Sequence, residues 1–140
     1  MIRLREFKKE DVGKINAASQ CADFNDLRER MFSFTLFDDS TDVIIGCGGL
    51  DRVYEHCACA WLILDKDACL EMKNVIRAIR EIRLAIDHYI AVNPVISRVH
   101  AEVIDEKRFV SFAKLCGFKV EAILGNMHYS GKDLVIMRYK

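Results

Sequence analysis

The chain has 140 residues, of which 51% are apolar and 30% charged, and its 21 basic and 21 acidic side chains cancel. One proline and seven glycines exclude collagen-like and low-complexity proteins, and the apolar fraction is too high for a disordered chain. The absence of net charge argues against nucleic-acid and anionic-membrane partners, and no apolar run approaches the roughly 20 residues of a membrane-spanning helix. We therefore expect a single domain over residues 1–140.

The six cysteines predict neither disulfides nor a metal site. The first residues alternate between apolar and charged and do not form an apolar signal core, so we expect a cytoplasmic protein in which disulfides are rare. Paired Cys-x-x-Cys motifs, which are typical of zinc sites, do not occur. Cys57 and Cys59 share a strand face beside His56, but cysteines more commonly serve as small buried hydrophobes.

The first half of the chain predicts strands and two helices, on the basis of apolar spacing. The expected strands cover residues 2–7, 34–37, 43–50 and 57–64, and the expected helices cover 8–19 and 24–32. The polar residues 38–42 predict a turn and residues 51–56 a loop. The strand over 57–64 is continuously apolar, which is typical of the centre of a sheet.

The second half begins with the most regular helical pattern of the chain, over residues 69–90. It continues with a strand over 98–104, a helix over 106–116 that ends at Gly117, and strands over 118–124 and 134–139. A turn is expected at 130–132, between the last two strands. This order predicts a mixed α/β (α+β) fold: one sheet of about seven mostly antiparallel strands, with helices on both faces.

The order and several segments resemble the GNAT superfamily of acyl-CoA-dependent N-acyltransferases. Residues 98–103, followed by a helix that ends in the run Lys-Leu-Cys-Gly-Phe-Lys-Val-Glu (114–121), are similar to a C-terminal segment of this family. Residues 126–133 are similar to the loop before the last strand of the family, and residues 45–50 resemble its third strand. The resemblance implies a GNAT fold, acetyl-CoA as the cofactor, and transfer to an amine on a small molecule or a protein.

The sequence departs from the family at the loop before the long helix. Family members carry glycines there, which allow backbone N–H groups to contact the cofactor pyrophosphate at the helix N-terminus. Leu70, Met72 and Asn74 occupy about those positions here. Asp67 is the expected N-cap, and together with Glu71 it places carboxylates where phosphates would bind. We therefore predict a weak pyrophosphate site.

The resemblance places the cofactor along the end of the fourth strand and at the starts of two helices. The residues that it assigns to cofactor binding are Leu62, Ile63, Leu64, Cys69, Leu70, Glu71, Met72 and Glu106. Glu106 stands where the family usually has a cofactor-contacting Asn, and Ala113 stands where many members have a Tyr general acid.

Transfer to an amine requires a base, directly or through water. Glu102 lies where some family members keep such a base, and His100 shares its strand face, so these two are the predicted catalytic residues. Glu55 and His56, before the fourth strand, are the second choice. The alternative is an ordinary polar strand face, on which Arg98, His100 and Glu102 form local ion pairs.

Three functions stay open at this point. The first is an acetyl-CoA-dependent N-acetyltransferase with an atypical loop. The second is a catalytically silent protein that binds another protein, because Trp61, the glycine-free loop and the pair Arg108-Phe109 resemble a small family of bacteriophage GNAT-like proteins, some of them virion-associated. The third is an acyl-CoA sensor. The last two strands are also candidates for pairing across a homodimer.

Overall fold

The computed structural model describes residues 1–15, 32–65, 67, 71–128 and 130–140. Seven strands and three helices lie in this part of the chain. In chain order they are β1 (Ile2–Glu6), α1 (Lys9–Val12), β2 (Phe32–Asp38), β3 (Val43–Tyr54), β4 (Cys57–Leu64), α2 (Met72–Val92), β5 (Arg98–Ile104), α3 (Lys107–Leu115), β6 (Phe118–Leu124) and β7 (Leu134–Tyr139). None of the described helices is long and apolar enough to cross a membrane.

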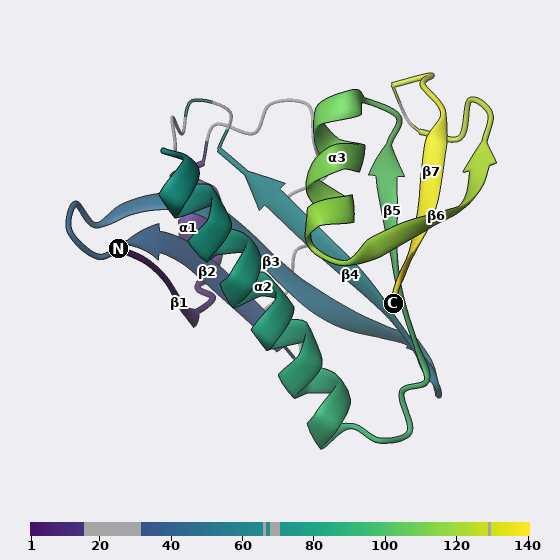
Figure 1. The fold of residues 1–140 in the computed structure, drawn as a ribbon, viewed down its shortest axis with the longest axis horizontal. Helices are drawn as coiled ribbons and strands as arrows, with labels where there is room; N and C mark the ends of the chain where they lie inside the picture. Colours follow the sequence, from purple (N-terminus) through teal and green to yellow (C-terminus); the bar gives the residue numbers. More distant parts are fainter. Residues whose placement is uncertain (16–31, 66, 68–70, 129) are drawn as a thin grey trace.

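The strands form one mixed sheet in the spatial order β1-β2-β3-β4-β5-β7-β6 (Figure 1). Neighbouring strands are antiparallel except β4 and β5, which run parallel because α2 returns the chain to the same end of the sheet. The predicted sheet of about seven mostly antiparallel strands is confirmed.

The two parallel strands are paired over a short stretch only. Cys57–Ala60 of β4 lie opposite Arg98–Ala101 of β5. Beyond these residues the strands diverge, and their carboxyl ends lie well apart in Figure 1. Residues 61–64 of β4 keep β3 as a partner on one side, and on the other side no strand of the described part of the chain pairs with them.

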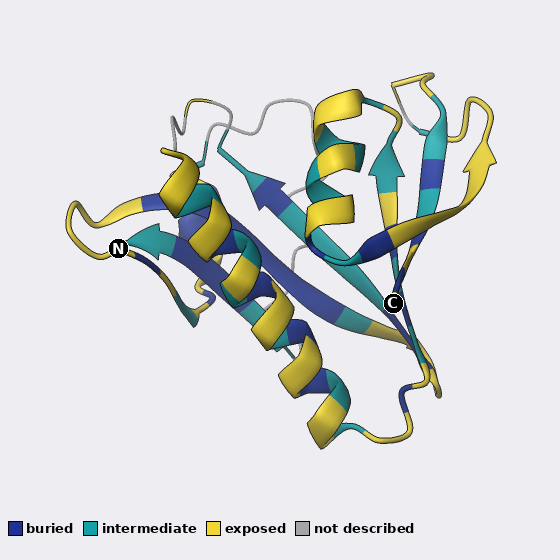
Figure 2. Ribbon diagram, in the orientation of Figure 1, coloured by how far each residue is buried: buried dark blue, intermediate teal, exposed yellow. Residues whose placement is uncertain are grey.

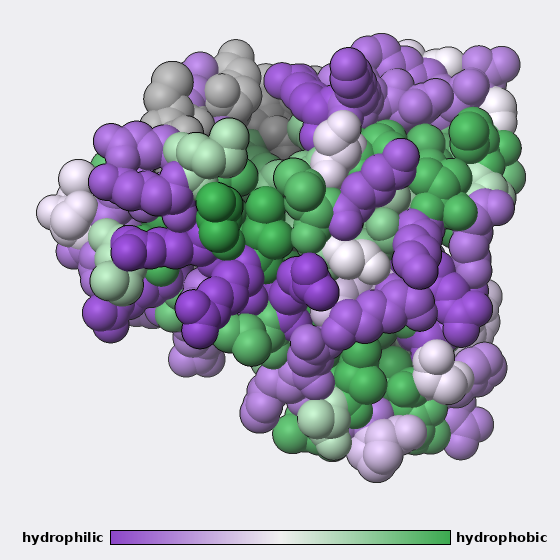
Figure 3. Space-filling model, in the orientation of Figure 1, coloured by the Kyte–Doolittle hydropathy of each residue, from purple (hydrophilic) through white to green (hydrophobic). Residues whose placement is uncertain are grey.

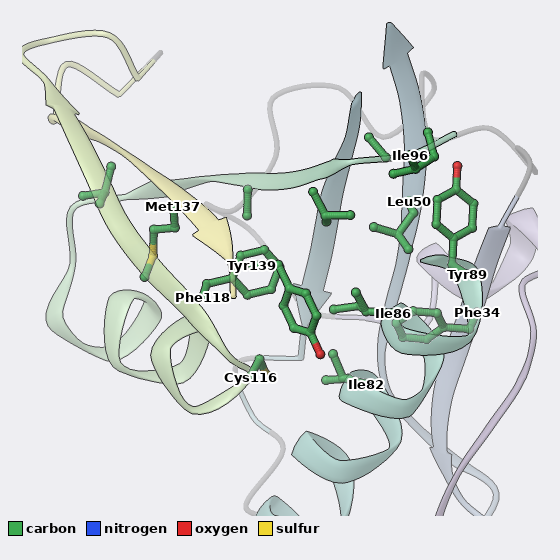
Figure 4. Close-up of a cluster of buried hydrophobic side chains, with 14 residues drawn as sticks. Phe34, Leu50, Ile82, Ile86, Tyr89, Ile96, Cys116, Phe118, Met137 and Tyr139 are labelled. Atoms are coloured by element: carbon green, nitrogen blue, oxygen red, sulfur yellow. The ribbon is translucent and has the colours of Figure 1, made fainter. Parts of the chain in front are cut away.

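α2 and α3 cover one face of the sheet. The buried residues of α2 recur at helical spacing and therefore share one side of the helix: Ala78, Ile82, Ile86 and Tyr89. Three of these pack with the end of α3 and with inward-facing strand residues in the main core, part of which is shown in Figure 4. The outer side of α2 is exposed (Figure 2), and its charged residues alternate there with apolar patches (Figure 3).

α1 lies on the opposite face. Its Val12 packs in a separate cluster with Phe7, Ile44 and Cys47, beside the partly buried Trp61. Described helices therefore cover both faces, as the sequence predicts.

Several predicted boundaries in the first half are wrong. β3 continues to Tyr54 through the expected loop over 51–56, because Asp51 and Arg52 pair with residues of β4. Phe32, expected at the end of a helix, begins β2 opposite Leu50. α1 ends at Val12, so the expected helix over 8–19 is shorter within the described residues. Residues 16–19 and 24–31 of the two expected helices lie outside the described residues.

The start of the long helix also differs. α2 begins at Met72 and its N-cap is Glu71, whose backbone is extended and whose side chain makes no capping hydrogen bond. The prediction of Asp67 as N-cap is therefore wrong: its N–H donates to Oδ1 of Asp65 at 2.8 Å, within the preceding turn. Cys69, where the helix was expected to begin, lies outside the described residues.

The last third follows the predictions closely. α3 is one residue shorter at each end than expected, and β6 and β7 have the predicted bounds. Gly117 has φ 101°, a conformation that favours glycine, and this confirms it as the residue that ends α3. In the β6–β7 connection, the N–H of Gly131 donates to the carbonyl of His128 at 2.8 Å and closes the expected turn.

Candidate functional site

A cavity of about 290 Å³ opens where β4 and β5 diverge. It is lined on the sheet side by residues 59–64 of β4 and 101–104 of β5. The helices contribute apolar side chains to its wall: Ile82, Ile86, Phe109, Phe112, Ala113 and Cys116. The cavity is thus built where the sheet lacks strand pairing, and most of its wall is apolar.

The end of β4 offers backbone groups to this cavity. Leu62, Ile63 and Leu64 line it and pair with β3 on their other side, opposite Gly48, Cys47 and Gly46. Because β5 has moved away, the N–H and C=O groups that point toward β5 are not used in the ladder between β4 and β5. An extended ligand can therefore form strand-like hydrogen bonds at Leu62 and Ile63.

Glu102 is an acidic side chain of β5 at the same cavity. It pairs with Ile136 of β7 through the backbone, and its side chain is exposed. Its carboxylate has no hydrogen-bond or ion-pair partner among the residues that the structure describes, so it is available to accept a proton or bind a cation.

The neighbours of Glu102 on the same strand face are engaged elsewhere. Arg98 forms an ion pair with Glu121 of β6, and this interaction lowers the pKa of the Glu121 carboxyl. Nδ1 of His100 lies 3.4 Å from Sγ of Cys57, and His100 does not line the cavity. The ion pairing expected on this strand face is therefore found for Arg98, whereas Glu102 forms no ion pair with the described residues.

Glu106, expected to contact the cofactor, lies outside the cavity wall and forms ion pairs with two basic side chains. Its carboxylate accepts hydrogen bonds from Nζ of Lys132 at 2.5 Å and from Nε of Arg108 at 3.2 Å. The bond from Lys132 is the main cause of the lowered pKa of Glu106. This ion pair joins the start of α3 to the β6–β7 connection.

The expected residues at the start of α2 also lie outside the cavity wall. Met72 is 73% exposed, and Oε2 of Glu71 pairs with Nζ of Lys73 at 2.8 Å. Asn74 and Val75 donate to the carbonyl of Glu71, so the N–H groups of Met72 and Lys73 are the free donors of the first turn within the described part of the chain. Leu70, like Cys69, lies outside the described residues.

Glu55 and His56, the second-choice pair, lie in the turn between β3 and β4. The carbonyl of His56 accepts the N–H groups of Ser97 and Arg98 at the paired end of the parallel strands. This is the end of β4 remote from the cavity, and neither residue lines it.

Two cavity thiols are held protonated. Burial and, to a lesser extent, the nearby Glu102 carboxylate raise the pKa of Cys59 to about 12. Burial likewise raises the pKa of Cys116 to about 12. Because the thiolate is the nucleophilic form of cysteine, neither residue is suited to form an acyl-enzyme near neutral pH. No cluster of three or more His, Cys, Asp or Glu suited to a metal occurs in the described ranges.

His128, in the β6–β7 connection, lines the same cavity and was not singled out from the sequence as a site residue. It is 26 positions from Glu102, and no spacing rule links two residues across a strand, a helix and a loop. The signal that could have found it is its place in the segment 126–133, which resembles the loop before the last strand of the family. His128 therefore lines the same cavity as Glu102 and residues 62–64 of β4.

No protein-family model and no curated protein matches the sequence. Solved structures match the fold over nearly the whole chain. A GNAT-family acetyltransferase from Bacillus anthracis has a TM-score of 0.69 at 11% identity, covering 98% of this chain and 93% of that one. A chimeric spermidine N-acetyltransferase from Vibrio cholerae has a TM-score of 0.69 at 17% identity, with 99% and 94% covered. A chain of the NatC complex bound to Gag peptide and CoA has a TM-score of 0.70 at 13% identity, with 99% and 97% covered.

The match to each of these structures covers 98–99% of the chain, so the likeness extends over the whole fold. The mixed seven-stranded sheet, with parallel strands that diverge around a cavity, agrees with the resemblance seen in the last third of the sequence. The chain has the fold of the GNAT acetyltransferases.

Proposed function

We propose that the protein is an acetyl-CoA-dependent N-acetyltransferase that uses Glu102 as its base. The observation that supports this most is the cavity between the diverging strands, which is lined both by the β4 backbone at Leu62 and Ile63, beyond the ladder with β5, and by Glu102, whose carboxylate has no partner among the described residues. Acetyl-CoA would supply an activated thioester carbonyl. The β4 backbone would bind its extended arm, and the apolar wall would keep water away from the reacting atoms.

In this function Glu102 removes the proton of the acceptor amine as the amine attacks. The acyl carbon would form a C–N bond to the amine and break its C–S bond, and the sulfur would leave as a thiolate with the electron pair of that bond. The protonated thiols of Cys59 and Cys116 favour direct transfer over a covalent acyl-cysteine. The four described cysteines are free, which supports a reducing, cytoplasmic setting for this activity.

Binding and turnover test the proposal separately. Acetyl-CoA at 100 times its Kd should stabilise the folded protein by about 2.7 kcal/mol in thermal or calorimetric titration. Replacement of Glu102 by Gln should leave this binding unchanged and lower kcat on a panel of amines by roughly 10²–10⁴-fold. The matched control is Glu55→Gln, at the paired end of the strands, which should retain activity. No stabilisation at millimolar acetyl-CoA would contradict the proposal.

The start of α2 is the proposed site of the cofactor diphosphate. The free N–H groups of Met72 and Lys73 suit an anion, but the Glu71 carboxylate beside them opposes it. Replacement of Glu71 by Gln should therefore tighten acetyl-CoA binding by about two- to fivefold. Glu81, further along the same helix, provides a control in the variant Glu81→Gln, which should not change the Kd. Equal affinities in all three proteins would place the diphosphate elsewhere.

A second function, binding of another protein without catalysis, is favoured by one observation. The edge strand β6 exposes large apolar side chains: Val120 at 43%, Ile123 at 58% and Leu124 at 38%. An exposed apolar edge of this kind is typical of interaction surfaces. Sedimentation of the wild type and of the variant Ile123→Lys tests whether β6 mediates self-association. A wild type that forms a dimer and a variant that does not would support an interaction through β6. A monomeric wild type would contradict a homodimer.

A further inference from the structure

The cavity passes through the gap between β4 and β5, because residues from both faces of the sheet line it. Ala60 and Ala101 pack with the main core, on the face that α2 and α3 cover. Trp61 packs against the cluster of α1 on the opposite face. Successive side chains of a strand alternate between faces, so Glu102, next to Ala101, also lies on that opposite face.

On the helical face the cavity ends inside the main core. Leu50, Ile86 and Phe118 line the cavity, yet they are only 1%, 3% and 5% exposed, so they form its closed end. Figure 4 shows these three side chains in the core, where they come from β3, α2 and β6. Glu102, in contrast, is exposed. The cavity therefore leads from an exposed carboxylate to a buried apolar end.

Two small residues leave room at the point where β4 and β5 separate. Ala60 and Ala101 lie opposite each other in the last described pair of that ladder, and Leu50 lies opposite Ala60 on the other side. Leu62 and Ile63, which would bind the arm of the acyl donor, lie further along β4 toward its carboxyl end. The space beside Ala60 is therefore left for the group that the arm carries.

The cavity is larger than an acetyl group requires. Its volume of about 290 Å³ is nearly twice the ~150 Å³ of an engineered apolar cavity that holds a benzene molecule. When the end of the donor arm takes a share of this volume, apolar space of about the size of benzene remains. That space suits a linear chain of about four to eight carbons.

We infer that the site takes acyl thioesters with a chain of about four to eight carbons, whose hydrocarbon end lies among Leu50, Ile86 and Phe118. The inference rests on the proposed function and specifies its donor. The reaction is the same for the longer chain. The acyl carbon forms a C–N bond to the amine and its C–S bond breaks. The sulfur leaves as a thiolate with the electron pair of that bond, and the amine proton goes to Glu102.

A series of saturated acyl-CoA donors from acetyl to decanoyl tests the inference, with the amine panel as acceptors. Each methylene that moves from water into the cavity should raise kcat/KM about fourfold until the closed end is filled, so hexanoyl-CoA should exceed acetyl-CoA by roughly 10²-fold. In the variant Glu102→Gln, calorimetry should show a correspondingly lower Kd for hexanoyl-CoA. Equal Kd values, or a kcat/KM that is highest with acetyl-CoA, would overturn the inference and leave the proposed function standing. Absence of binding and turnover with every donor would overturn the proposed function itself.

Substitutions in the cavity wall should change the preferred chain length. Ala60→Leu fills the space beside the last pair and should lower the preference for hexanoyl-CoA over acetyl-CoA by about tenfold or more. Ile86→Ala lengthens the closed end and should move the best donor to a chain about two or three carbons longer, which provides a test if Ala60→Leu does not fold. The matched control is Ala85→Leu, since Ala85 packs against the same core but lies outside the cavity wall. An unchanged preference in both wall variants would overturn the inference.

Discussion

Arg5 and Asp11 form a two-bond ion pair that fixes α1 to the edge of the sheet. Nη2 of Arg5 lies 2.7 Å from Oδ1 of Asp11, and Nη1 lies 2.8 Å from Oδ2. Asp11 is only 2% exposed, and Oγ1 of Thr35 in β2 also donates to Oδ2, at 2.7 Å. One buried carboxylate thus joins β1, α1 and β2.

Removal of this carboxylate should be costly. In Asp11→Ala the guanidinium of Arg5 and the buried hydroxyl of Thr35 lose the carboxylate that accepts from both, and we expect the free energy of unfolding at pH 7 to fall by about 3 kcal/mol. The control is Arg3→Ala, because Arg3 pairs with Asp39 at 2.7 Å on the surface and should contribute less than about 1 kcal/mol. Urea denaturation measures both, and equal losses would contradict the assigned role of Asp11.

The contribution of Asp11 should depend on pH. Burial opposes its ionisation, but the hydrogen bonds from Arg5, Thr35 and the N–H of Lys8 outweigh burial, so its pKa lies below the ordinary value of 3.8. The unfolded chain therefore binds the proton more readily, and the stabilisation is complete above pH 3.8 and is lost as the pH falls through the lower folded pKa. The difference in unfolding free energy between wild type and Asp11→Ala should be constant from neutral pH to about pH 5 and shrink only under stronger acid. A difference that shrinks already near neutral pH would contradict this assignment.

Substitutions of Gly117 and Gly131 allow the cost of backbone strain to be compared with the cost of a steric clash. Both have positive φ, 101° and 81°. A Cβ on Gly117 would lie 3.0 Å from Cε1 of Tyr139, whereas no atom of the described residues lies within 4 Å of a Cβ on Gly131. Gly131→Ala should cost about 1–2 kcal/mol from backbone strain, and Gly117→Ala should cost more, because the Tyr139 ring must also move. Thermal unfolding compares the two, and equal losses would show that the ring is not in the way.

The cavity thiols should react slowly in the folded protein. With pKa values of about 12, Cys59 and Cys116 are almost entirely protonated at pH 7.5. Iodoacetamide followed by peptide mass spectrometry should label both residues much more slowly in the native state than in urea. Rapid native labelling of Cys59 would indicate a thiolate and would reopen the route through an acyl-cysteine.

The sequence predicts most of the fold because local patterns decide most of it. The stripe of α2, the alternation of β5 and the helix end at Gly117 depend on neighbours in the chain, and each is found near its expected place. The errors occur where distant partners decide. Asp51 and Arg52 extend β3 because β4 lies opposite, although their polar character favours a loop.

The candidate site was predictable only in part, for the same reason. Leu62–Leu64 and Glu102 follow from strand positions that the family resemblance identifies, and they line one cavity. Glu106 lies outside the cavity wall and forms an ion pair with Lys132, a contact across 26 residues that no local pattern encodes. His128 reaches the cavity through a folded turn, and the hydrogen bonds that orient it appear only once the turn is formed.

The short pairing between β4 and β5 divides the sheet into two parts, each with its own hydrogen-bonded ladders. Strands β1–β4, with α2 in contact with β1, are held by their own antiparallel ladders, and β5–β7 with α3 are held by theirs. Only Cys57–Ala60 and Arg98–Ala101 join the two halves along the ladder. The halves are joined instead through the helical layer, because Ile82 and Ile86 of α2 share the main core with Tyr139 of β7, whose hydroxyl donates to Oδ1 of Asp87 at 2.8 Å. The width of the opening is therefore held by side-chain packing on one face of the sheet and not by the strand ladder.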